Sequence, residues 1–166
     1  STVQKLLKMR ERTGEVEMKE KFPPEAERIM QERFGHDTLL SVATVDGEIP
    51  YVRTVNAYYE DGAFYIITHG LSNKMKHIRK NANVAICGDW FTAHGQGSNL
   101  GWFCKEENRG IADKLRSAFS SWINNGHNNF DDENTCIFRI QLTHGILFSH
   151  GTRYELDFTA ETDGKI

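Results

Sequence analysis

The sequence RTVNAYYEDGAFYIITHGLSNK, from Arg53 to Lys74, contains two β-rich runs, a tight turn and the start of a helix. Asp61-Gly62 separates the two runs, and Asp-Gly in this position is a strong hairpin signal because such turns need positive φ. Ser72 precedes a helical pattern and stands where an N-cap residue belongs. The stretch therefore predicts a β-hairpin that leads directly into a helix.

A second Asp-Gly turn, Asp46-Gly47, lies upstream between TLLSVATV and PYVRTVNAYY, so three consecutive antiparallel strands are expected. The other elements expected are helices at 25–34, 71–82 and 109–123, a strand at 83–91, a Gly-rich loop at 92–101, a short strand at 101–105, and two or three strands within 135–158. Many strands, few helices and no βαβ alternation predict a mainly β protein, an antiparallel β-barrel with α-helices.

The composition is that of an ordinary globular domain, with 39% hydrophobic and 26% charged residues among 166. We expect one domain over residues 1–166, whose residues 1–22 form an N-terminal helical arm. The net charge of -3 argues against a nucleic-acid partner, and no apolar run is long enough for a membrane span. Three widely spaced cysteines indicate reduced thiols and a cytoplasmic protein.

Arg53 is the first candidate binding residue. Alternation along its strand places it on one face with Tyr51, Val55, Ala57 and Tyr59, an otherwise largely apolar set. A buried guanidinium needs a partner, which is either an ion pair within the protein or a bound anion.

Three further polar side chains follow in the next strand and helix start. Thr68 ends the third strand, Ser72 is the N-cap candidate, and Lys74 lies two residues further on. Each has an ordinary explanation as a β-former, a helix cap or a surface lysine. Together with Arg53 they predict a clamp for a phosphate, because a helix start offers free N–H groups and the positive end of the dipole.

Residues 41–90, SVATVDGEIPYVRTVNAYYEDGAFYIITHGLSNKMKHIRKNANVAICGDW, resemble the core of the pyridoxamine 5'-phosphate oxidase-like FMN-binding split-barrel family. The shared features are an Arg-x-Val strand, a strand that ends in Thr, a Ser-x-Lys helix start and the run NANVAICGDW. The resemblance implies an antiparallel Greek-key split β-barrel that forms a homodimer with FMN at the interface.

The resemblance also implies a role for each candidate residue. Arg53, Thr68, Ser72 and Lys74 would hold the FMN phosphate. Backbone groups near Val55, Asn56 and Ile67 would lie along the ribityl chain and the ring. Gln96, in HGQG, is the candidate for the glutamine that approaches the flavin from the other subunit, although an ordinary polar loop residue explains it equally well.

Two departures from the family pattern narrow the expected function. Asn73 stands where many members carry a second basic residue, so the phosphate site has one charge fewer. The C-terminal GTRYELDFTAETDGKI lacks the Arg- and Trp-bearing substrate motif of the true oxidases. Oxidation of pyridoxamine phosphate is therefore not expected, and the nearer likeness is to the general-stress and flavin-reductase-like members.

We therefore predict an FMN-binding flavoprotein, an oxidoreductase that takes electrons from a reduced nicotinamide or another small-molecule donor. The alternative is a non-catalytic sensor or storage module that holds FMN or haem on the same fold. No catalytic residue stands out in the sequence. The seven histidines show no metal-binding spacing such as HxH or HExxH, so no metal site is expected.

Overall fold

The computed structural model describes residues 22–159, so the expected helical arm at 1–22 lies almost wholly outside the described residues. The strands are β1 (Thr38–Asp46), β2 (Ile49–Glu60), β3 (Ala63–His69), β4 (Asn83–Gly88), β5 (Phe91–Trp102), β6 (Thr135–Ser149) and β7 (Thr152–Asp157). The helices are α2 (Pro24–Phe34), α3 (Asn73–Lys80), α4 (Arg109–Ala118) and a short 3-10 turn at Glu106–Asn108.

The strands form one antiparallel sheet in the order β3-β2-β1-β4-β5-β6-β7, and β6 also pairs with β3, which closes a barrel. Three consecutive strands, β1 to β3, form a meander, and the chain then crosses through α3 to place β4 beside β1. That order is a Greek key. The predicted antiparallel Greek-key barrel with helices is thus confirmed, and no helix among residues 22–159 is both long and apolar enough to span a membrane.

Both Asp-Gly hairpins form where the sequence predicts them. Gly47 has φ 65°, and Asp61 and Gly62 have φ 47° and 80°. These are the left-handed conformations that tight hairpin turns require. The two turns fix the register of β1 with β2 and of β2 with β3.

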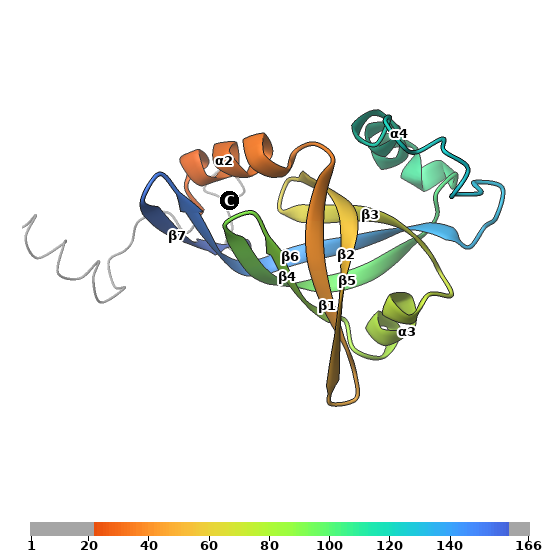
Figure 1. The fold of residues 1–166 in the computed structure, drawn as a ribbon, viewed down its shortest axis with the longest axis horizontal. Coiled ribbons are helices and arrows are strands. Elements are labelled where there is room, and N and C mark those ends of the chain that lie inside the picture. Colours follow the sequence, from red (N-terminus) through yellow and green to blue (C-terminus); the bar gives the residue numbers. More distant parts are fainter. Residues whose placement is uncertain (1–21, 160–166) are drawn as a thin grey trace, which may run out of the picture.

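The barrel is split between β2 and β3. β2 pairs with β1 along most of its length, from Ile49 to Ala57, but pairs with β3 only at Tyr58–Glu60. Beyond that point β3 continues along β6 as far as His69. Figure 1 shows the β1–β2 hairpin projecting from the barrel, with α3 on the same side. The edges of β2 and β3 that face the split therefore have no strand partner in the described structure.

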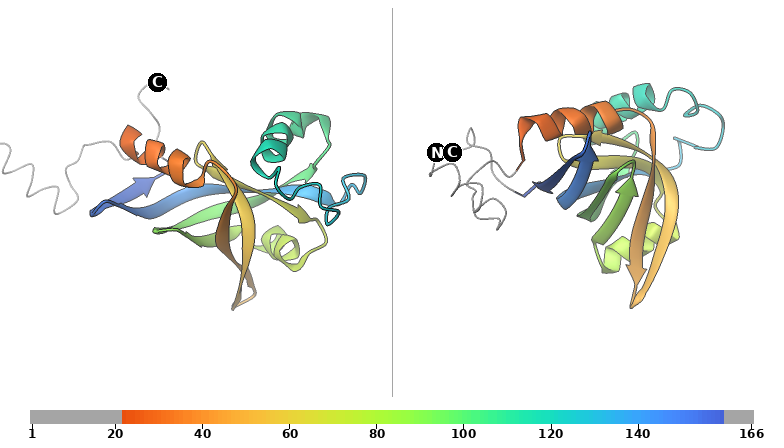
Figure 2. Two further views of the ribbon diagram at one scale, coloured as in Figure 1. Left: turned by 45° about the horizontal axis from the view of Figure 1, so that its top comes forward. Right: turned by 60° about the vertical axis from the view of Figure 1, so that its left-hand side comes forward.

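Two apolar clusters fill the fold. The larger occupies the barrel and the inner face of α2, whose Ala26, Met30 and Phe34 are buried. The smaller packs α4 against the outside of the barrel through Leu115 and Phe119. Figure 2 shows that α2 and α4 both lie on the side of the barrel away from α3. Pro24 occupies the first turn of α2, as expected for a residue that lacks the N–H group.

The prediction of a loop at 92–101 is wrong, because these residues belong to β5. Their side chains alternate between buried Ala93, Gly95 and Gly97 and exposed polar residues. A Cβ at Gly95 would come within 2.6 Å of the Gln141 carbonyl oxygen, and one at Gly97 within 2.7 Å of the Phe138 ring. These glycines thus allow close packing in a strand, whereas composition alone indicated a turn.

Three other predicted elements also change. Gly101 and Trp102 end β5, so no separate strand forms at 101–105, and the helix expected at 109–123 ends at Ala118. The C-terminal strands predicted from TCIFRIQL and GILFSH are one strand, β6. β6 is long because β5 covers one edge of it while β3 and then β7 share the other.

Candidate anion-binding site

Arg53 lies on the inward face of β2 beyond the core residues Ala57 and Tyr59, as the alternation predicts. One guanidinium nitrogen, Nη1, donates to Thr44 Oγ1 at 2.7 Å, to the Val42 carbonyl at 3.2 Å and to the Tyr51 carbonyl at 3.4 Å. All three acceptors are neutral. Burial lowers the pKa of Arg53 below its usual value.

Lys74 reaches the same region from the first turn of α3. Its Nζ donates to Thr68 Oγ1 at 2.9 Å, which joins the helix start to the end of β3. Burial, and after it the charge of Arg53, lower the pKa of Lys74, with Cys136 acting in the opposite sense. The positive charge of Arg53 therefore lies close enough to Lys74 to disfavour the protonated form of its ammonium group.

Ser72 occupies the N-cap position of α3 but makes no side-chain cap hydrogen bond. Its Oγ is buried and has no hydrogen-bond partner within residues 22–159. The first backbone N–H groups of a helix also lack partners within the helix. A buried hydroxyl is normally hydrogen-bonded, so this one indicates a site arranged for a missing partner.

The four clamp residues predicted from the sequence therefore gather around α3: Arg53, Thr68, Ser72 and Lys74. Within residues 22–159, neither Arg53 nor Lys74 forms an ion pair with a carboxylate. Two partly desolvated cations, a free hydroxyl and a helix N-terminus are complementary to a phosphate, which accepts hydrogen bonds and carries negative charge. The residues present fit the phosphate of FMN.

The residues expected along the rest of the cofactor lie on the two sides of the split. Val55 and Asn56 are on β2, and Ile67 is on β3, where those strands are no longer paired with each other. The side chain of Asn56 is already engaged, since its Nδ2 donates to Asp37 Oδ1 at 2.9 Å. Asp37 also accepts from Trp122 Nε1 at 2.9 Å, so the Asn56 side chain belongs to a hydrogen-bonded group within the protein.

Gln96 is exposed on the outer face of β5 and donates through Nε2 to Asn83 Oδ1. Asn83 follows α3, so Gln96 lies towards the end of this helix that is remote from Ser72. In the described residues no hydrogen bond joins Gln96 to the clamp. Its proposed contact with a flavin of the other subunit remains a prediction.

Sequence reasoning missed Thr44 and His77, both buried beside Arg53. Thr44 Oγ1 hydrogen-bonds to His77 Nδ1 at 2.8 Å as well as to Arg53. Two signals were present in the sequence. Thr44 interrupts the inward apolar row of β1 that includes Val42, and His77 is three residues after Lys74 and therefore on the same side of α3.

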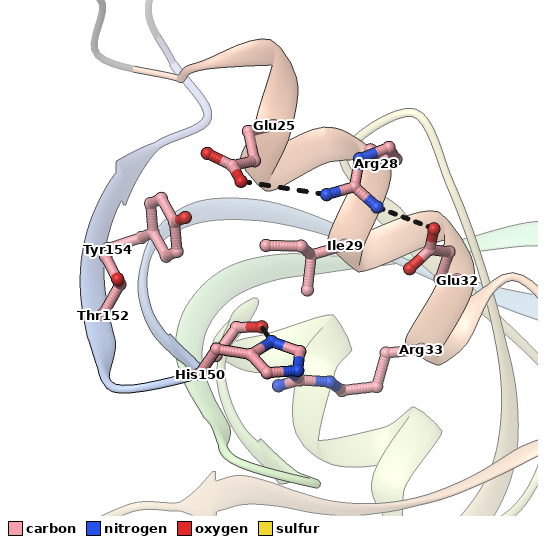
Figure 3. Close-up of a pocket in the computed structure, with 9 residues that line it drawn as sticks. Glu25, Arg28, Ile29, Glu32, Arg33, His150, Thr152 and Tyr154 are labelled. Atoms are coloured by element: carbon pink, nitrogen blue, oxygen red, sulfur yellow. Dashed lines mark hydrogen bonds and ion pairs between the residues drawn. The ribbon is translucent and has the colours of Figure 1, made fainter.

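A separate pocket of about 340 Å³ lies between α2 and the β6–β7 hairpin (Figure 3), whereas α3 lies beside the β1–β2 hairpin (Figure 1). Its charges largely satisfy one another, because Arg28 pairs with Glu32 at 2.8 Å and with Glu25 at 3.8 Å. Arg33 donates to the backbone carbonyls of Asp89 and Phe148. The charged groups that line this pocket thus have partners within the protein.

Comparison with known proteins agrees with the fold. Residues 26–147 match the family model described as pyridoxamine 5'-phosphate oxidase. The chain belongs to the pyridoxamine 5'-phosphate oxidase family. The match covers most of the chain and includes all four clamp residues. The comparison with curated proteins gave no match.

Solved structures resemble this family member at low sequence identity. A NimC/NimA family protein from Clostridium acetobutylicum is 20% identical with a TM-score of 0.59, covering 82% of this chain and 96% of its own. General Stress Protein 26 from Bacillus anthracis is 16% identical with a TM-score of 0.58, covering 78% and 97%. An FAD-binding protein from Mesorhizobium loti is 16% identical with a TM-score of 0.57, covering 71% and 90%. These likenesses show a shared fold.

Proposed function

We propose that the protein is an FMN-binding flavoprotein whose clamp holds the cofactor phosphate. The observation that carries the proposal is the buried, unpartnered hydroxyl of Ser72 beside two cations, Arg53 and Lys74, that have no carboxylate partner among residues 22–159. A phosphate would accept from all three and would offset the burial of both cations. Family membership and a flavin-binding structural neighbour support a flavin as the carrier of that phosphate.

The split in the barrel supports the placement of the rest of the cofactor. Val55 and Asn56 on β2 pair with β1, and Ile67 on β3 pairs with β6, whereas the opposite edges of these strands present backbone groups that have no strand partner among residues 22–159. Such groups are free to hydrogen-bond the ribityl chain and the polar rim of the ring. FMN would thus take the place of strand pairing between β2 and β3.

The proposal includes a homodimer with FMN at the interface. Exposed apolar side chains cluster on the projecting hairpin and next to the clamp, with Val52 70% and Leu71 57% exposed and Ile49 and Tyr51 also exposed. Exposed apolar surface of this kind is typical of an interaction site. A second copy on this side would cover both the hairpin and the open side of the split. Gln96 would then approach the flavin of the other subunit.

The activity that fits is an oxidoreductase of the general-stress or flavin-reductase-like type, supplied by a reduced nicotinamide or another small-molecule donor. FMN supplies the redox chemistry when bound, and the residues described here bind and orient it. Three unpaired cysteines support a cytoplasmic location, where thiols stay reduced.

The test is the purified protein titrated with FMN and, separately, with riboflavin, followed by flavin fluorescence and absorbance. We expect saturable FMN binding that is much tighter than riboflavin binding. Absence of FMN binding would refute the proposal. Turnover with NADH or NADPH and a range of acceptors then separates an oxidoreductase from a non-catalytic flavin module, since the module would bind FMN without turnover.

A further inference from the structure

Two buried polar side chains beneath the clamp, Thr44 and His77, have no role in the proposed cofactor contacts. Thr44 is 0% exposed and His77 is 9% exposed. They connect β1 to α3 through the 2.8 Å hydrogen bond between Thr44 Oγ1 and His77 Nδ1. The same hydroxyl is the shortest contact of Arg53, at 2.7 Å.

Packing of the core does not require a hydroxyl group at position 44. The inward row of β1 runs Leu40, Val42, Thr44, and a valine would fill the third position with the same shape. Burying a hydroxyl without hydrogen bonds is unfavourable. Here the hydroxyl is bonded on both sides, so its effect is to join Arg53 to His77.

The direction of these hydrogen bonds follows from the donors available. Arginine only donates, so Thr44 Oγ1 accepts from Arg53 Nη1. With the ring proton on Nε2, His77 Nδ1 accepts the hydroxyl hydrogen of Thr44, whereas the other tautomer donates to the same oxygen. His77 thus fixes the rotation of the Thr44 hydroxyl and keeps its lone pairs towards Arg53.

As a result, the guanidinium group of Arg53 is held through one of its nitrogens, Nη1. Nη1 takes all three hydrogen bonds of Arg53, while within residues 22–159 no hydrogen bond is formed by its Nε or Nη2. Those remaining N–H groups form the edge that binds phosphate oxygens in a bidentate manner. The hydrogen-bonded series Arg53–Thr44–His77 is called the relay below. His77 lies on the helix that carries Lys74, so the relay links Arg53 on the strand to the helix of Lys74.

We propose that Thr44 and His77 are positioning residues that give the site its selectivity for a phosphorylated flavin by holding Arg53 in its phosphate-binding orientation. This inference rests on the proposed binding of FMN. Neither residue touches the cofactor. Their effect is therefore on the preference for FMN over riboflavin, which differ only in the phosphate, and a merely structural role would leave that preference unchanged.

The test compares the FMN and riboflavin dissociation constants of the wild type with those of Thr44→Val. Loss of a hydrogen bond to a charged group predicts FMN binding weakened about tenfold. Riboflavin binding should stay within about twofold, since small losses outside the clamp lie in that range. Thr38→Val is the matched control, because Thr38 is on the same strand about 20 Å away and donates its hydroxyl to the Ala57 carbonyl. It should leave the FMN preference unchanged.

Substitutions at His77 provide an independent variant should Thr44→Val fold poorly. His77→Leu removes the acceptor and should reduce the FMN preference, whereas His77→Gln keeps an acceptor oxygen and should largely restore it. The relay is overturned if Thr44→Val and His77→Leu keep the wild-type ratio of FMN to riboflavin affinity, or weaken both ligands equally. Wild-type protein that binds neither flavin would instead refute the proposed function itself.

Discussion

Replacing Lys74 with methionine should weaken FMN binding without destabilising the cofactor-free protein. Lys74 extends from the first turn of α3, and among residues 22–159 its ammonium donates only to the neutral Thr68 hydroxyl, at 2.9 Å. Burial and the charge of Arg53 both lower the pKa of Lys74, so its positive charge is unfavourable in the protein without a bound anion. Methionine keeps the apolar stem and removes that charge.

The expected magnitude follows from the contact that is lost. A hydrogen bond between a charged donor and a phosphate is worth about 1.5–3 kcal/mol, so FMN affinity should fall roughly 10- to 150-fold. Riboflavin has no phosphate, so its affinity should change less than about twofold. The melting temperature of the cofactor-free variant should equal or exceed that of the wild type, because an unfavourable buried charge is gone.

The assay is a fluorescence titration of each protein with FMN and with riboflavin at one ionic strength. Lys76→Met is the matched control, since Lys76 is exposed on the same helix and its replacement changes the net charge equally. FMN affinity within about twofold of the wild type in Lys74→Met would refute the clamp, given the size of the interaction predicted. An equal loss of FMN and riboflavin affinity would refute it as well.

Other predictions concern packing, pH and assembly. Gly97→Ala should destabilise the fold by about 1–3 kcal/mol in urea unfolding, because its Cβ would meet the Phe138 ring at 2.7 Å. Gly110→Ala, in α4 with open space around it, should stabilise by up to about 1 kcal/mol. Burial raises the pKa of Tyr59, so stability should fall as the pH rises above the ordinary tyrosine pKa of 10.0, and Tyr59→Phe should reduce that slope. Val52→Lys should shift a dimer towards monomer in analytical ultracentrifugation.

Each of these has an opposite outcome that would contradict it. Equal stability of the two glycine variants would mean that the β5 glycines do not serve close packing. An unchanged alkaline slope in Tyr59→Phe would assign the loss of stability to other groups, such as Tyr58, whose pKa is raised to about 12. A dimer that persists in Val52→Lys would place the interface away from the hairpin.

Local patterns in the sequence were sufficient for the meander and the clamp. The two Asp-Gly turns determine β1 to β3, because positive φ is a property of a few adjacent residues. The start of α3 also follows from Ser72 and the helical spacing after it. Arg53 faces inward because side chains alternate along β2. Each of these depends on neighbours in the chain.

Contacts between distant residues could not be predicted in this way. Gly95 and Gly97 were assigned to a loop because composition does not show that Gln141 and Phe138 pack against them. The long β6 was divided because its two partners on one edge, β3 and β7, come from far apart in the chain.

The sequence by itself indicated an antiparallel barrel and the candidates Arg53, Thr68, Ser72 and Lys74, since turn chemistry, strand alternation and a helix start are local. The tertiary structure alone decided that β2 and β3 separate, that the Ser72 hydroxyl has no hydrogen-bond partner among residues 22–159, and that Thr44 contacts both Arg53 and His77. Those features depend on register and on packing between β1, β2 and α3, which place side chains up to 33 positions apart within hydrogen-bonding distance.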